Sequence, residues 1–147
     1  MGNISLKISN LRSFNRKLNK TLDSEVVDAA KSRMQSSVRL VRKTAIESIQ
    51  RGVKTGQTYK KYNPKREHTA SAPGQPPATD TGFLVQNITT EVRSQGKKVI
   101  GEIIASTPYA KALEFGTRKM AARPFLNPAL RKNKKKIQRK FRNSYFK

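Results

Sequence analysis

The chain of 147 residues contains no cysteine, no tryptophan, a single histidine and only nine acidic residues. The absence of cysteine excludes disulfides, thiolate metal sites and a cysteine nucleophile. With His68 alone, histidine-based metal clusters are excluded and a Ser-His-Asp triad has little support. The acids are scattered, and none pair at the spacing of a metal-dependent nuclease. We therefore expect no enzyme, with no catalytic residue, no metal ligand and no cofactor.

Long hydrophobic runs are also missing, since no stretch approaches the roughly 18 apolar residues of a membrane-spanning helix. The first ten residues lack the apolar centre of a secretory signal. A myristoylation pattern fails because Leu6 stands where Ser or Thr is required. These observations predict a protein without a membrane partner.

Positive charge is what the chain has in excess, with 32 Lys and Arg residues and a net charge of +23. A free subunit with this charge repels itself, and such a balance usually indicates an anionic partner, most often nucleic acid. The densest stretch is 131–147, which holds no acid. Its candidate polyanion contacts are Lys132, Lys134, Lys135, Lys136, Arg139, Lys140 and Arg142. DNA, an acidic partner protein and plain solvent remain alternative surroundings for these side chains.

Hydrophobic spacing predicts the main elements. Alternating Ile4, Leu6 and Ile8 indicate a strand, and helical spacing recurs over 11–22. The strongest pattern predicts a long helix that begins after a cap at Asp23 or Ser24 and ends at Arg51-Gly52. Its apolar positions are Val26, Ala30, Met34, Val38, Val41, Ala45 and Ile49.

The second half of the chain predicts a hairpin of strands 88–93 and 98–105, with a turn at 94–97 and the second strand covered on both faces. A short helix is expected over 81–87, capped by Asp80, with Leu84 and Ile88 turned inward. Another is expected over 109–115, ended by Gly116 with a positive φ. A last helix begins at Asn127-Pro128. The expected fold is α+β: one long N-terminal helix packed on a small antiparallel sheet, with a long Pro/Gly-rich loop and a basic C-terminal helix. We divide it into a domain, 1–130, and a basic helical tail, 131–147.

The Pro/Gly-rich loop, 53–79, is polar and basic, and 71–77 can be neither helix nor central strand. Its composition predicts mobility in the free subunit and order on docking. Tyr59 and Tyr62 lie among lysines and an arginine, a mixture that can stack on bases and pair with phosphates or simply form a solvated arm. The candidate docking residues are Tyr59, Tyr62, Pro73, Gly74, Pro76 and Pro77.

Four segments together carry a resemblance to a known family. They are Ala72-Pro-Gly-Gln-Pro-Pro77, Asp80-Thr-Gly-Phe-Leu84, Tyr109-Ala-Lys-Ala-Leu-Glu-Phe-Gly-Thr117 and Ala121-Ala-Arg-Pro-Phe-Leu-Asn-Pro-Ala129. In order and spacing the chain resembles, over residues 4 to 140, the small tail-completion or head–tail joining phage proteins of the "gene product ten" family, to which lambda minor tail protein Z is similar.

The resemblance implies an α+β fold and a structural role in a siphophage-like virion. The expected location is the neck or upper tail, reached from the host cytoplasm during assembly. The expected partners are further copies in a ring, six favoured and twelve the alternative, together with neighbouring neck and tail proteins and the genome in the channel.

The last two segments supply the candidate assembly interface: Tyr109, Leu113, Glu114, Phe115, Gly116, Arg123, Pro124 and Phe125. Of these, Leu113, Phe115 and Phe125 either close the core or contact a neighbouring subunit. We expect Glu114 to pair with a cation such as Arg118 or Arg123, either within one subunit or between subunits. The alternative function is a non-specific nucleic-acid-binding protein acting through its basic arms, which would leave these segments without a purpose.

Overall fold

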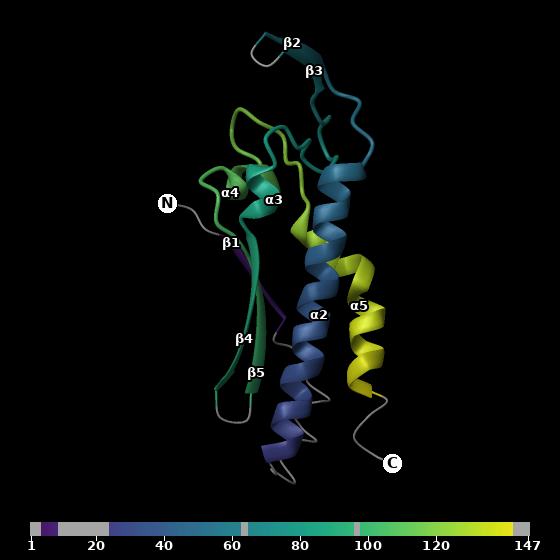
Figure 1. The fold of residues 1–147 in the computed structure, drawn as a ribbon, viewed down its shortest axis with the longest axis vertical. Helices are drawn as coiled ribbons and strands as arrows, with labels where there is room; N and C mark the ends of the chain where they lie inside the picture. The colour runs from purple at the N-terminus through teal and green to yellow at the C-terminus, as the bar shows by residue number, and fades with distance from the viewer. Residues whose placement is uncertain (1–3, 9–23, 63–64, 96–97, 143–147) are drawn as a thin grey trace.

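The computed structural model describes residues 4–8, 24–62, 65–95 and 98–142 and has an α+β fold, as predicted (Figure 1). In chain order the elements are β1 (Ile4–Ile8), α2 (Ser24–Arg51), β2 (Thr58–Tyr62), β3 (Lys65–Thr69), α3 (Phe83–Gln86), β4 (Ile88–Gln95), β5 (Lys98–Ala105), α4 (Ala110–Phe115) and α5 (Leu126–Arg142). The expected helical segment 11–22 and the cap at Asp23 lie outside the described residues.

The sheet holds three antiparallel strands in the order β1-β5-β4. The predicted hairpin is confirmed, but β4 continues to Gln95, so paired strand occupies the first half of the expected turn. The central strand β5 is buried on both faces, as its composition predicts, and even Glu102 is buried there.

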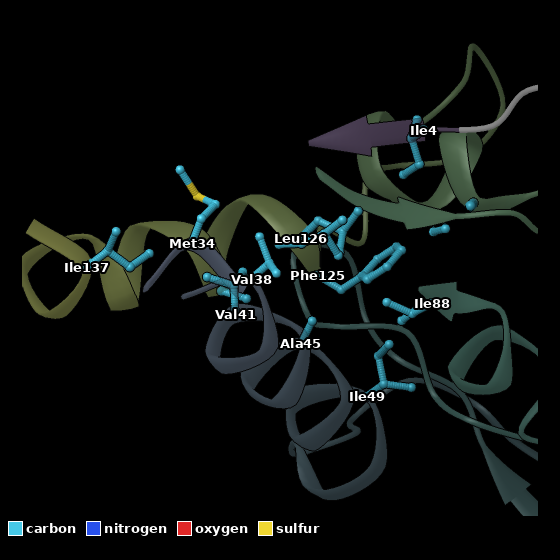
Figure 2. Packing of buried hydrophobic residues seen from close by; sticks show 14 of the residues in the cluster. Ile4, Met34, Val38, Val41, Ala45, Ile49, Ile88, Phe125, Leu126 and Ile137 are labelled. Atoms are coloured by element: carbon cyan, nitrogen blue, oxygen red, sulfur yellow. The ribbon is translucent and has the colours of Figure 1, made fainter. Parts of the chain in front are cut away.

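Helix α2 lies along the sheet and carries the core (Figure 2). Its buried apolar positions repeat at steps of three and four, as predicted for a helix that packs on a sheet, and include Met34, Val38 and Ala45. Gly101 of β5 allows the close approach, because a Cβ there would lie 2.6 Å from Val38 Cγ1. Side chains from β1, β4 and α5, among them Ile4, Ile88 and Leu126, complete the same cluster, together with Phe125 just before α5.

Helix α5 packs beside α2, on the side away from the sheet (Figure 1). It begins at Leu126, one residue before the predicted cap. Its buried stripe is Leu126, Ala129, Asn133, Ile137 and Phe141. Within the stripe, Asn133 Nδ2 donates to Thr44 Oγ1 of α2 at 2.9 Å and to Ala129 O at 2.8 Å. The boundary that we drew between residues 130 and 131 falls inside this helix, and its far end belongs to the common core.

Two local predictions were wrong. The segment 53–79 is not a plain loop, since it contains the antiparallel hairpin β2–β3. Asp80 does not cap α3, whose N-cap is Gly82 in the left-handed region at φ 78° with no side-chain acceptor. The inward-facing residues of this part, Leu84 and Ile88, are buried as expected.

Candidate assembly surface and basic helix

The four segments that carry the resemblance lie together at one end of the molecule. Gly74 N donates to Ala122 O at 2.9 Å, and Arg123 N donates to Leu113 O at 2.6 Å. Arg123 Nε also reaches Ser71 O at 3.2 Å. We call this part the loop end: residues 53–62, 65–87 and 106–125. Figure 1 shows the loop end above the sheet, with the hairpin β2–β3 as its outermost part.

Glu114 links helix α4 to the start of helix α5. Its carboxylate, 4% exposed, accepts from the backbone N–H groups of Phe125, Leu126 and Asn127 at 2.8, 3.0 and 2.8 Å. These are the free donors at the start of α5, where negative charge is also favoured by the helix dipole. Within the subunit, the expected ion pair with Arg118 or Arg123 is not formed, because the described partners of Glu114 are backbone groups of a helix terminus.

Gly116 follows directly and ends α4 at φ 77° and ψ 179°, a region essentially restricted to glycine. A Cβ there would lie 2.9 Å from both Ala122 N and Met120 O. The positive φ predicted for this glycine is confirmed. Gly116 turns the chain so that the segment up to Pro124 returns alongside α4. Pro124 itself is half-buried.

The apolar candidates divide into core and surface residues. Phe125 is fully buried and Leu113 is half-buried, whereas Phe115 is 61% exposed. Every exposed large hydrophobic residue of the described ranges lies at the loop end: Val53, Tyr59, Tyr62, Phe83, Tyr109 and Phe115. Sequence reasoning missed Val53 and Phe83, because single apolar residues in short segments show no period from which exposure can be inferred.

A groove of about 260 Å³ opens between these exposed residues. Its walls include Phe83, Tyr109, Leu113 and Arg123, and His68 and Asp80 lie at its hairpin side. Two of these residues, Tyr109 and Phe83, are among the exposed aromatics, so the groove and the apolar surface are continuous. His68 is half-buried here.

The hairpin β2–β3 is attached to the rest of the loop end by Asp80, which binds both Lys61 of β2 and Arg66 of β3. The hydrogen bond from Lys61 and the charge of Arg66 lower the pKa of the Asp80 carboxyl. Tyr59 and Tyr62 are exposed on the hairpin, Tyr62 to 85%. The hairpin thus presents aromatic side chains and cations together, as expected of a docking or nucleic-acid-binding arm.

The Pro/Gly segment behind the hairpin is held by polar contacts. Lys54 Nζ donates to Pro76 O at 2.9 Å and to Ser48 O of α2 at 3.2 Å, and partial burial lowers its pKa. Pro77 is buried, while Pro73 and Gly74 are exposed. Gly74 has a φ of 79° and is the turn glycine expected. The mobility of the free segment stays a prediction.

The basic candidates lie away from the loop end, on α5. Of the predicted residues, Lys132, Lys134, Lys135, Lys136, Arg139 and Arg142 are exposed. Lys140 is partly buried, and its Nζ donates to Ser36 Oγ at 2.8 Å, so this side chain links α5 to α2. Arg131 is also exposed and belongs with the first group. No acid occurs anywhere in α5.

The described part of the chain contains no group of three or more His, Cys, Asp or Glu side chains that could hold a metal ion. None of its helices combines the length and apolar character that crossing a membrane requires.

The chain was also compared with known proteins. No family model, curated protein or solved structure matches it.

Proposed function

We propose that this chain is a structural virion protein of a tailed bacteriophage, a tail-completion or head–tail joining component that forms a ring in the neck or upper tail. The observation that supports this most is the gathering of the four resembling segments. They are spread over residues 72–129, yet three of them are joined by hydrogen bonds of Gly74, Leu113, Glu114 and Arg123. The remaining segment, 80–84, lines one groove together with residues of the other three.

The surface of that end has the character of a protein interface. Protein interfaces are enriched in exposed aromatic residues around a desolvated centre. Phe83, Tyr109 and Phe115 supply such residues beside a groove, and the hairpin extends beyond them. Contacts between two different patches of identical subunits close into a ring when the rotation between subunits permits. Six copies would match the symmetry of a tail, and twelve is the alternative.

The test is genetic and structural. A stop codon in the gene, within the phage that carries it, should yield filled heads and separate tails that fail to join. Wild-type protein supplied in trans should restore joined particles. The double variant Tyr109→Ser with Phe115→Ser should not restore them, whereas the control Lys111→Ser, exposed on the same helix α4, should. Normal infectious particles without the protein would reject the proposed function.

A second candidate, non-specific binding of nucleic acid, is favoured by the acid-free helix α5. It predicts a monomer that shifts any DNA and leaves particle assembly intact. The complementation experiment separates the two, because only the first candidate requires the aromatic surface of the loop end.

A further inference from the structure

The exposed face of α5 is cationic from Arg131 to Arg142. At 3.6 residues per turn, Arg131, Lys135, Arg139 and Arg142 fall on one line opposite the buried stripe. We call these four residues the α5 ridge. Lys132, Lys134 and Lys136 flank it, and all seven side chains are exposed.

The charge density of this face is close to that of a nucleic acid. The span from Arg131 to Arg142 is about 16 Å at 1.5 Å per residue. Seven exposed cations over that length give roughly one charge every 2–3 Å, against one phosphate per about 1.7 Å of duplex axis. The cylinder of a helix also fits along a duplex groove. The face therefore matches duplex DNA in both charge spacing and shape.

Helix α2 shows that such a face is not a consequence of the overall composition. Two of its cations are paired with acids: Lys43 lies 3.9 Å from Glu47 and Lys31 lies 3.5 Å from Asp28. On α5, no described acid lies within ion-pair distance of a cation. Helix α5 thus carries eight cations and no acid, whereas the longer α2 carries six cations and three acids.

The composition of the face distinguishes nucleic acid from an acidic protein. Protein interfaces carry aromatic and apolar anchors and are depleted in lysine. The α5 face is rich in lysine, and every exposed large hydrophobic residue of the described ranges lies instead at the loop end. Phosphate contacts need only cations and give affinity without sequence specificity.

We propose that the α5 ridge and its flanking lysines bind the phosphate backbone of duplex DNA without regard to sequence. The inference deepens the proposed function and rests on it only for the source of the duplex, the genome that passes through the neck. Binding itself depends on α5 alone.

The experiment measures how salt weakens binding of the full chain to a labelled 20-base-pair duplex by fluorescence anisotropy. The test variant is Arg131→Gln, Lys135→Gln and Arg139→Gln. The matched control is Lys111→Gln, Arg118→Gln and Lys119→Gln, three exposed cations of the loop end. Both variants reduce the net charge from +23 by three, to +20. Gln has nearly the helix propensity of Lys and Arg, so α5 should persist, as circular dichroism would verify.

Each phosphate neutralised contributes about −0.9 to the slope of log K against log salt. We expect the test variant to lose up to about 2.7 units of slope, the control to keep the wild-type slope, and two duplexes of unrelated sequence to bind equally. A wild-type slope shallower than about −2.7, or equal losses in both variants, would overturn the inference. Retained binding to polyglutamate without binding to the duplex would overturn it in favour of an acidic protein.

Failure of this inference is distinguishable from failure of the proposed function. If the variant loses DNA binding but particles assemble without the protein, the inference stands and the proposed function falls. If joining requires the protein but duplex binding is insensitive to the α5 ridge, the reverse holds.

Discussion

The loop end and helix α5 differ both in how they are held in the fold and in what they expose. At the loop end, short segments with little regular structure are held by hydrogen bonds to backbone groups, and aromatic side chains remain exposed. On α5, a regular helix is anchored by one thin buried stripe, and its remaining surface is nearly all cationic. We therefore expect substitutions at the loop end to act through its geometry, and substitutions on the exposed face of α5 to act through charge.

The largest expected effect is at Glu114. Glu114→Ala would leave the N–H groups of Phe125, Leu126 and Asn127 without their acceptor, at about 1–3 kcal/mol for each buried donor. We expect a loss of about 3 kcal/mol or more in the free energy of unfolding, measured by urea denaturation. The exposed control Glu47→Ala should stay within about 0.5 kcal/mol. A similar small loss for both variants would mean that solvent replaces the carboxylate.

The second largest loss of stability is expected from a substitution at Gly116. Gly116→Ala forces a Cβ into a conformation that costs about 1–3 kcal/mol, against two backbone atoms at 2.9 Å. The same substitution at Gly74, whose φ is also positive but whose Cβ meets nothing within 4 Å, should cost less. Thermal unfolding of the two variants gives the comparison. Equal costs would show that crowding by Ala122 and Met120 contributes nothing.

Asp80 should affect one element and not the whole fold. Asp80→Asn removes the charge that binds Lys61 and Arg66, so hydrogen exchange of the β2–β3 amides should accelerate while core amides keep their protection. Because its folded pKa is lowered, the contribution of Asp80 is complete above the unfolded pKa of about 3.9 and is lost as pH falls through the lower folded value. Unchanged exchange in the hairpin would mean that cross-strand pairing alone holds it.

The smallest expected effect is on α5, where stability and binding should separate. Arg131→Gln, Lys135→Gln and Arg139→Gln together should change the free energy of unfolding by no more than about 0.5 kcal/mol, since the side chains are exposed and lack described acidic partners. A loss above 1 kcal/mol on urea denaturation would show that the ridge contributes to the fold and would weaken the contrast with the loop end.

The regular elements were predictable because they carry a period. The apolar positions of α2 and the β-rich run of β5 specify both elements and their burial, and Gly116 marks the end of α4. The hairpin β2–β3 shows no such period. Its residues are mostly exposed on both faces, so no alternation distinguishes it from a loop, and its anchor Asp80 lies outside it in sequence.

The role of Glu114 was hidden for a different reason. An acid among many cations suggests an ion pair, yet its partners are backbone groups 11 to 13 residues away that only the tertiary fold brings near. Asn127 concealed this role, because the sequence offers it as a local cap. The helix in fact begins one residue earlier, after Phe125, whose side chain has no acceptor for the first turn.

The most direct test of the whole account is a reconstruction of the neck and upper tail of the particle that contains this chain. We predict a ring of copies, six favoured, with Phe83, Tyr109 and Phe115 in protein contacts and the α5 ridge turned toward the DNA channel. Absence of the chain from neck and tail would contradict the proposed function. A ring with the α5 ridge facing outward, away from DNA, would contradict the division of the surface into an assembly end and a DNA-binding helix.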